Sequence, residues 1–331
     1  MANHTPDPRA LEQLTASARY HDYRYASNPL TEGATGEVPL VRFDAELHER
    51  GGSRVLPLDT SSTLGCTGPA TSPGLCANFV RVRAGEAVLT DANATSHLFF
   101  VMRGAGSSAP ADGDAGGQPI PWKAGDLFTL PARSRMLHAA TDDAALYWVH
   151  DEPLLRYLGV TATQRQFTPT LYAREAIHEA LEGVLRDPSS ATANRLSVLL
   201  GNRLFPQTMT VTHVIWAMFG LLPVNALQAP HRHQSVALDL VVDARPGCYT
   251  MVGRTLDHDG SIKDPIRVDW KPHSAFVTPP GLWHSHHNES GQPAHILPIQ
   301  DAGLHTFLRT LNILFSRRTK DGGHDVIDRA G

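Results

Sequence analysis

A four-residue pattern occurs twice in the chain with identical internal spacing. The matched positions are Trp122, Lys123, Phe128 and Pro131 in one copy, and Trp270, Lys271, Phe276 and Pro279 in the other, 148 residues later. Each copy lies in the same context, in which an alternating strand and a turn precede a strand that carries histidine. The repeat therefore predicts two copies of one β-module, at about residues 40–160 and 200–310.

Glycine and proline favour short strands over long helices in the rest of the chain. The 331 residues include 27 Gly and 24 Pro, which divide the apolar segments into short runs. Two helices are predicted: one begins at Asp7-Pro8, and one spans Thr170 to Asp187, with Thr168 and Pro169 as its cap and first residue. We therefore expect a mainly β protein with two antiparallel jelly-roll barrels and a few flanking and linking helices.

Charge and hydrophobicity exclude several classes of function. The chain has 29 basic and 33 acidic residues and lacks a basic run, which disfavours nucleic-acid binding. Its longest clean apolar stretch, residues 214–224, is too short for a membrane span. No secretory signal is visible, and the three scattered cysteines are typical of reduced thiols. We expect a cytoplasmic protein that does not bind membranes or nucleic acid.

Histidines in the second module have the spacing of a metal site. His231 and His233 flank Arg232, so a strand would place both imidazoles on one face, about 7 Å apart along the chain. Fifty-one residues beyond His233, the Pro279-Pro280-Gly281 turn leads to His284. Three neutral imidazoles would leave open positions on a divalent metal, which a substrate and O₂ require.

These two motifs resemble the cupin signature, with one informative departure. The signature expects a carboxylate four residues after the second histidine of the pair, where this chain has Ala237. Gentisate and salicylate 1,2-dioxygenases resemble this chain there, because they carry alanine within a run similar to residues 231–238. The Trp-His-X-His-X-Asn-Glu run from Trp283 to Glu289 resembles their second motif. The similarity extends over about 130 residues, from Arg195 to Phe315.

The resemblance to this family implies a specific chemistry. It implies Fe(II) held by His231, His233 and His284, and ring opening by O₂ between the carboxyl-bearing and hydroxyl-bearing carbons of an aromatic 2-hydroxy acid. Gentisate or a 5-substituted salicylate such as 5-nitrosalicylate is the expected substrate. The resemblance also implies a homo-oligomer, expected to be a tetramer.

The first module resembles the metal-free cupin of the same family. Through the repeat, Met136 aligns with His284 and His138 with His286, and this half of the chain has no His-X-His. We expect residues 1–162 to form a metal-free cupin domain with a leading helix, and residues 163–331 to form a linker helix and the iron-binding cupin. The order is unusual, because the iron-bearing cupin comes first in the relatives.

Four further residues are candidates for the substrate pocket. His286 shares the strand face of His284 and would transfer a proton or support a ligand by hydrogen bonding. Arg195 matches a family arginine that contacts substrate, although an interface or surface ion pair is the alternative. Trp216 would line the pocket or belong to the core. Asp239 stands where the relatives have an arginine, so an anionic substrate would require a cation to offset it.

Two other functions remain open on sequence grounds. One is a different cupin enzyme that uses Mn, Ni or Zn, such as an isomerase or aminohydrolase. The other is a non-catalytic bicupin that binds a ligand. A stoichiometric Fe(II) content would distinguish the dioxygenase from the first, and loss of substrate only in air would distinguish it from the second.

Overall fold

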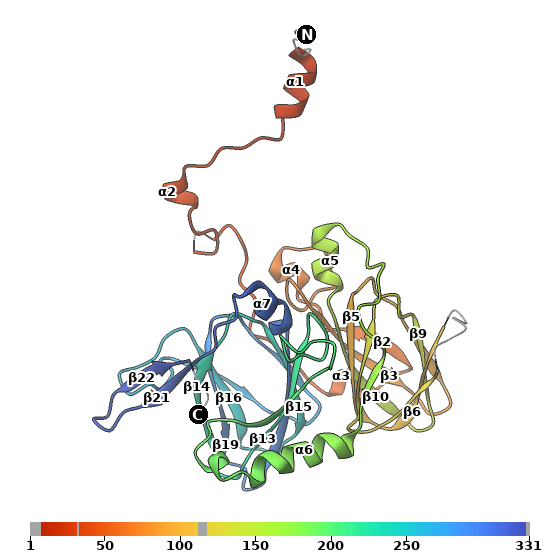
Figure 1. The fold of residues 1–331 in the computed structure, drawn as a ribbon, viewed down its shortest axis with the longest axis vertical. Helices are drawn as coiled ribbons and strands as arrows, with labels where there is room; N and C mark the ends of the chain where they lie inside the picture. Colours follow the sequence, from red (N-terminus) through yellow and green to blue (C-terminus); the bar gives the residue numbers. More distant parts are fainter. Residues whose placement is uncertain (1–7, 32, 112–117, 329–331) are drawn as a thin grey trace. The chain divides into compact units, whose positions relative to one another are not determined.

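The computed structural model describes residues 8–31, 33–111 and 118–328 (Figure 1). The chain divides into two compact units, residues 1–37 and 38–331. The first unit contains the helices α1 (Pro8–Thr15) and α2 (Tyr23–Ala26). The predicted N-terminal helix is therefore present from Pro8, whereas Asp7, its predicted first residue, lies outside the described residues. No helix in the described part of the chain combines the length and apolarity needed to cross a bilayer.

The second unit contains two modules built from antiparallel strands. The strands of the first module are β2 (Arg54–Pro57), β3 (Cys76–Val82), β4 (Ala87–Thr90), β5 (Ser96–Arg103), β6 (Ala105–Pro110), β7 (Ile120–Lys123), β8 (Leu127–Pro131), β9 (Met136–Ala140) and β10 (Ala144–His150). Together with β11 (Thr170–Tyr172) they form the sheets β11-β8-β5-β10-β3-β2 and β4-β9-β6-β7. Apolar side chains from both sheets form one core between them, including Phe99 and Trp148 of the first sheet and Val88 and Trp122 of the second.

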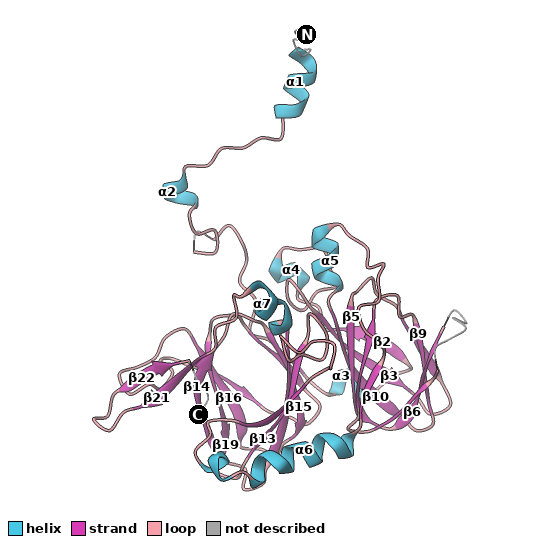
Figure 2. Ribbon diagram, in the orientation of Figure 1, coloured by secondary structure: helices cyan, strands magenta, loops and turns pink. Residues whose placement is uncertain are grey.

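The second module repeats this arrangement. Its strands are β12 (Leu196–Leu200), β13 (Trp216–Leu222), β14 (Leu227–Arg232), β15 (Ala237–Asp243), β16 (Cys248–Gly253), β17 (Ile266–Asp269), β18 (Ala275–Thr278), β19 (Trp283–Asn288), β20 (Ala294–Gln300), β21 (Leu314–Arg318) and β22 (His324–Ile327). Together with β1 (Arg42–Phe43) they form the sheets β1-β18-β15-β20-β13-β12 and β17-β16-β19-β14-β21-β22. The prediction of a mainly β protein with two antiparallel barrels is confirmed (Figure 2).

The repeated tryptophans occupy equivalent places in the two barrels. Trp122 and Trp270 are both 3% exposed, and each donates its indole N–H to a buried hydroxyl at 2.8 Å, that of Ser108 and that of Thr250 respectively. The sequence repeat is therefore a structural repeat that extends to a hydrogen bond inside each barrel.

Two short strands pair with the module on the other side of the predicted domain boundary. β1 (Arg42–Phe43) pairs with β18 of the second module, and β11 (Thr170–Tyr172) pairs with β8 of the first. The prediction of a helix from Thr170 is wrong at its start, because α6 spans Arg174–Arg186 and Ala173 is its N-cap. Residues 170–172 are compatible with a β-strand. Their pairing with the edge of β8 outweighs the helix-like spacing of the apolar residues in this segment. The boundary at 162/163 stays a prediction.

The outer faces of the two modules share a continuous apolar core. Tyr147 on β10 and Leu238 on β15 belong to it, although they face away from the interior of their own barrels. Ile177 and Leu181 of α6 are buried in the same core. The other short helices are α3 (Glu46–Glu49), α4 (Ser61–Leu64), the 3-10 turn η1 (Pro188–Ala191), α5 (Glu152–Leu158) and α7 (Ala302–Leu308). This sheet-on-sheet packing holds the two barrels together.

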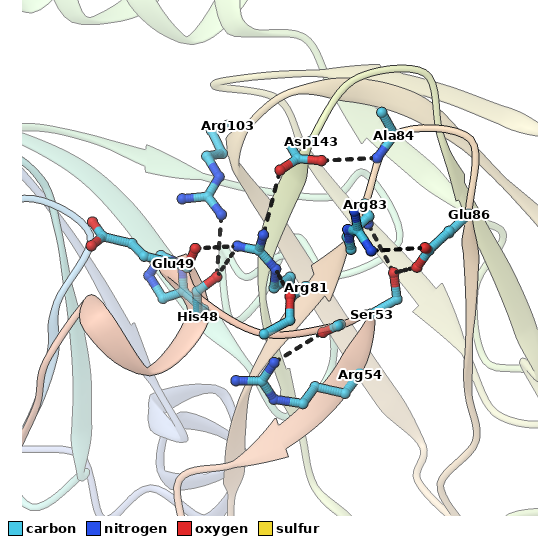
Figure 3. Close-up of polar contacts among 12 residues, drawn as sticks. His48, Glu49, Ser53, Arg54, Arg81, Arg83, Ala84, Glu86, Arg103 and Asp143 are labelled. Atoms are coloured by element: carbon cyan, nitrogen blue, oxygen red, sulfur yellow. Dashed lines mark hydrogen bonds and ion pairs between the residues drawn. The ribbon is translucent and has the colours of Figure 1, made fainter.

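His48 of α3 has polar contacts to both modules, of which Figure 3 shows those with Arg81 and Arg103 of the first module. Its backbone carbonyl accepts hydrogen bonds from Arg81 and Arg103, at 2.9 and 3.2 Å. Its ring Nε2 contacts the carbonyl oxygen of His273 in the second module at 3.1 Å. A carbonyl only accepts, so this nitrogen carries the proton, and burial lowers the pKa of His48 to about 4.

Two buried histidines inside the first barrel predict that the protein loses stability in acid. Burial lowers the pKa of His97 to about 4 and that of His138 to about 3. Both pKa values lie below the usual 6.5. The contribution of the two neutral histidines to stability is therefore fully present above pH 6.5, and it is lost as the pH falls towards 4 and 3. The variant His97→Phe keeps the stacking on Trp148. Between pH 7 and pH 4.5, we expect its free energy of unfolding to fall by roughly 2–3 kcal/mol less than that of the wild type.

Urea unfolding at the two pH values measures this difference. His21→Gln, at an exposed site in the first unit, is the control and should behave as wild type. Equal acid losses in His97→Phe and wild type would show that His97 does not drive the loss.

Candidate metal centre

Pairing of β14 with β19 brings the histidine motifs together inside the second barrel. His231 lies directly opposite His284 in the antiparallel register, and their ring centroids are 4.0 Å apart. His286 follows on the same face of β19, opposite Gln228. The three histidines are between 1% and 3% exposed. Strand parity and a single register therefore position three imidazoles at one buried place.

Among the described residues, these three histidines form the group that could hold a metal ion. One ligand nitrogen from each of His231, His284 and His286 lies within 4.8 Å of the other two. His233 lies beside this group, with ring centroids 5.0 Å from His284 and 6.3 Å from His231. Of the three predicted ligands, His231 and His284 lie in this group and His233 adjoins it, whereas the third member of the group is His286, which was predicted to transfer a proton or support a ligand.

The hydrogen-bond partner of Nδ1 distinguishes the three predicted ligands from His286. In His231, His233 and His284, Nδ1 contacts a backbone carbonyl oxygen, at 3.2, 2.9 and 3.2 Å respectively. The carbonyls belong to Ala229, Ser235 and Leu282. Because a carbonyl cannot donate, Nδ1 carries the proton in each ring and Nε2 keeps its lone pair. This is the tautomer that a ligand bound through Nε2 requires.

His286 has a hydroxyl group as its partner instead. Its Nδ1 lies 2.8 Å from the hydroxyl of Thr250, which already accepts the indole N–H of Trp270. The hydroxyl proton can then point to Nδ1, which leaves the proton of His286 on Nε2. In the first barrel the equivalent ring, His138, contacts the hydroxyl of Ser108 through Nδ1 and the hydroxyl of Thr90 through Nε2, both at 2.7 Å. The Nε2 of His286 is buried without a partner among the described residues.

The site favours neutral imidazoles. Burial lowers the pKa of His233 to about 4 and lowers the pKa of His231, His284 and His286 well below the usual value. The nearby Arg195 guanidinium lowers all four pKa values further. All four rings are therefore uncharged at neutral pH. The buried Nε2 atoms of His231 and His233 also lack partners within the described part of the chain, so this donor set fits a divalent metal.

Arg195 and Asp239 lie in the same barrel as the histidines. Asp239 on β15 is 2% exposed and accepts a hydrogen bond from the hydroxyl of Thr278 at 2.6 Å. Burial raises its pKa to about 6, against the opposing effects of Thr278 and Arg195. Arg195 forms no ion pair with the described residues, and its Nε is buried without a partner. Arg195 therefore does not form a surface ion pair, and it is the cation whose charge lowers the pKa of Asp239.

Trp216 lies on the interior side of the second barrel. On β13 it shares strand parity with Leu222, which belongs to the apolar core of that barrel. Its side chain is half-buried, and its indole N–H has no partner in the described structure. The sequence did not single out Thr250 for this site. The available signal was the repeat of Trp122 as Trp270. Each of the two indoles donates to a hydroxyl in its own barrel, and that hydroxyl in turn contacts a histidine.

No family model matches the chain. Its sequence is 26% identical over 205 residues to 1-hydroxy-2-naphthoate 1,2-dioxygenase from Nocardioides sp. (strain KP7), a match that covers 62% of this chain. The matched region amounts to 48%, about half, of that protein's length.

Solved structures of salicylate 1,2-dioxygenase from Pseudoaminobacter salicylatoxidans have a similar fold. One, a variant in complex with gentisate, has a TM-score of 0.67 at 14% identity and covers 94% of this chain and 96% of its own. Another has the same TM-score and identity, and the match covers 95% of this chain and 98% of its own. The bicupin fold predicted from the sequence is confirmed, and both comparisons support the predicted resemblance to gentisate and salicylate dioxygenases.

Proposed function

We propose that this bicupin is an Fe(II)-dependent dioxygenase that opens the ring of a salicylate-type acid between its carboxyl-bearing and hydroxyl-bearing carbons. The observation that carries the proposal is the cluster of buried, neutral imidazoles in the second barrel, three of which keep Nε2 as a lone-pair donor. The names of the similar proteins support the reaction class, because both are 1,2-dioxygenases of aromatic hydroxy acids. A cytoplasmic homotetramer is part of the proposal.

His231, His233 and His284 are the proposed metal ligands. Their Nδ1–H groups are fixed on carbonyl oxygens, which orients each ring and leaves Nε2 free to coordinate. The hydroxyl of Ser235 donates to Gln300 at 2.9 Å, which leaves the proton between His233 and Ser235 on the ring. When bound, iron(II) would supply sites for the two substrate oxygens and O₂ and a path for electrons from ring to O₂.

His286 is the proposed proton-transfer residue. Thr250, which is also bonded to Trp270, holds Nδ1 of its ring, and one ring nitrogen of His286 lies within 4.8 Å of a ring nitrogen of His231 and of His284. From there it can donate a hydrogen bond to the phenol oxygen of the substrate, or exchange a proton with it. Trp216 provides an aromatic wall on the same interior side of the barrel.

Arg195 is the proposed partner of the substrate carboxylate. A guanidinium matches a carboxylate with two parallel hydrogen bonds, and this one has a buried N–H that needs an acceptor. Asp239 reduces the positive charge of the site and thereby limits how strongly a second negative charge is attracted. Gentisate or a 5-substituted salicylate such as 5-nitrosalicylate is the proposed substrate class.

Oxygen uptake tests the proposal directly. Protein reconstituted anaerobically with Fe(II) is mixed with gentisate, salicylate, 5-chlorosalicylate or 5-nitrosalicylate in aerated buffer. We expect one O₂ consumed for each substrate lost, with no loss under nitrogen and none with metal-free protein. Substrate loss under nitrogen would instead favour an isomerase or aminohydrolase. Bound iron and bound substrate without any turnover would favour a binding protein.

Removal of the Thr250 hydroxyl tests how His286 is held. Thr250→Val leaves the Nδ1 of His286 and the indole N–H of Trp270 without their shared partner. We expect the iron content to be unchanged and kcat to fall about tenfold or more, because the correct tautomer of His286 is no longer favoured. Steady-state oxygen uptake together with metal analysis measures both quantities.

Two variants serve as controls for this experiment. Thr250→Ser keeps the hydroxyl and should retain most of the activity. Ser108→Ala removes the equivalent hydroxyl from the first barrel, where it contacts Trp122 and His138, and should leave kcat unchanged. Similar kcat in Thr250→Val and wild type would exclude this role of the hydroxyl.

A further inference from the structure

Gln228 is a buried polar residue of the second barrel to which the proposed reaction assigns no role. It lies on β14, and its side chain is 4% exposed. Its amide oxygen Oε1 is buried and has no hydrogen-bond partner among the described residues. An unpaired acceptor inside a protein destabilises the fold, so the presence of one at this place calls for an explanation.

A β-bulge turns Gln228 towards the histidines. On β14, Gln228 and His231 are three residues apart, but their partners on β19, His286 and His284, are two residues apart. Strict alternation would place residues 228 and 231 on opposite faces of the strand. The extra residue of the bulge places both on the face that carries His284 and His286. Leu227, the preceding residue, lies on the other face and is 57% exposed.

His286 lies between Gln228 and Thr250 in the sheet. Thr250 is directly opposite His286 on β16, and Gln228 is directly opposite it on β14. The hydroxyl of Thr250 contacts Nδ1 of the ring, whereas Nε2 is buried without a partner in the described part of the chain. Two neighbouring side chains on one face therefore each have an open polar atom, an acceptor in Gln228 and a donor in His286.

The first barrel has the same three positions without an open atom on the ring. His138 lies there between Ser108 on β6 and Val88 on β4. Its Nδ1 contacts the hydroxyl of Ser108, and its Nε2 contacts that of Thr90. Val88 belongs to the apolar core, and the register of β4 against β9 is regular. The barrel is thus compatible with an apolar residue at the place of Gln228, so its architecture does not require the amide.

One kind of chemical group can pair with both open atoms. It donates a hydrogen bond to the amide oxygen of Gln228 and accepts one from the ring N–H of His286. A hydroxyl group has this combination of donor and acceptor. A chlorine or nitro substituent has no hydrogen to donate to the amide oxygen, and an ammonium group has no lone pair to accept from the ring. The two residues together therefore favour a ligand that carries a hydroxyl.

We propose that Gln228 is a specificity-determining residue that recognises, together with His286, a hydroxyl group of the bound acid. The amide oxygen of Gln228 accepts the hydroxyl proton, and the Nε2–H of His286 donates to the hydroxyl oxygen. The inference rests on the proposed function, which assigns an aromatic hydroxy acid to the space beside His286. The hydroxyl is either the phenol group that every salicylate has or a second ring hydroxyl, as in gentisate.

Calorimetric titration under nitrogen measures this recognition without turnover in the full-length, iron-loaded protein. The probes are two pairs of acids, salicylate with 2-methoxybenzoate and gentisate with 5-methoxysalicylate, because a methyl ether keeps the oxygen but cannot donate. We expect Gln228→Met to weaken the binding of the hydroxy acid of at least one pair about fivefold or more and to leave its ether unchanged. An effect in the first pair identifies the phenol, and an effect in the second pair alone identifies the second hydroxyl.

Two further variants and a stability measurement separate recognition from a structural role. Gln228→Val introduces the residue that the first barrel has at this place, and it should act like Gln228→Met. Leu227→Met, on the exposed face of the same strand, is the matched control and should bind all four acids as the wild type does. Gln228→Met should unfold at the same or a higher temperature, because an apolar side chain replaces a buried amide oxygen without a partner.

The outcomes distinguish this role from the proposed reaction. If the acids bind but no oxygen is consumed in air, the reaction is excluded and the Kd values still test Gln228. If oxygen is consumed but both Gln228 variants bind every hydroxy acid as tightly as the wild type, the role of Gln228 is overturned and the reaction stands. Equal weakening of hydroxy acids and ethers, or no binding of any probe to the wild type, also overturns the role of Gln228.

Discussion

Replacing His233 by alanine is expected to reduce bound iron to less than a tenth of the wild-type content and to abolish oxygen uptake. The reason is that the Nδ1–H of His233 is fixed on the carbonyl of Ser235, which directs the lone pair of Nε2 into the barrel. Loss of one of three ligands leaves two imidazoles, which hold a divalent ion far more weakly. Metal analysis after anaerobic reconstitution, with circular dichroism to verify folding, measures this effect.

His286→Ala should give the opposite pattern, with iron retained and kcat lowered about 100-fold or more. His287→Ala is the matched control, because His287 stacks on Tyr249 with ring centroids 4.6 Å apart and has the opposite strand parity. It should retain both iron and activity. If His286→Ala loses the metal and His233→Ala keeps it, the ligand set is the close group of His231, His284 and His286 instead.

The second large effect is expected at Arg195. Arg195→Gln removes the proposed charge-assisted contact with the substrate carboxylate and leaves Asp239 buried without its nearby cation. A charged hydrogen bond of about 1.5–3 kcal/mol corresponds to a loss of roughly 10- to 100-fold in kcat/KM. The repulsion from Asp239 adds to this loss. Oxygen uptake at varied substrate concentration separates the rise in KM from any change in kcat.

Variants at Asp239 show whether the two residues act together. Asp239→Asn should lower KM for an anionic substrate severalfold, and Arg195→Gln/Asp239→Asn should recover part of the activity lost in Arg195→Gln. Arg203→Gln, at an exposed position, is the matched control and should behave as wild type. Normal kcat/KM in Arg195→Gln would exclude this residue from carboxylate binding.

Much of the architecture could be predicted because it depends on local patterns. The 148-residue repeat predicted two equivalent barrels, and both copies of its tryptophan donate to a hydroxyl inside a barrel. The alternation along β14 and β19 predicted that His231 and His284 share an interior, which their pairing confirms. Strand parity is a property of the chain itself, so a sequence can reveal which side chains share a face.

Other features depended on pairing between distant segments. Thr170 to Tyr172 have helical spacing, but they form β11 because the edge of β8 is available to them. The register of β16 against β19 places Thr250 beside His286, and no spacing along the chain predicts that contact. By itself, the sequence therefore determined the repeated β-modules and the faces of their strands. Tertiary structure alone decided which residues meet. The reason is that long-range packing sets the register of paired strands and the pairing of β1 and β11 with the opposite module.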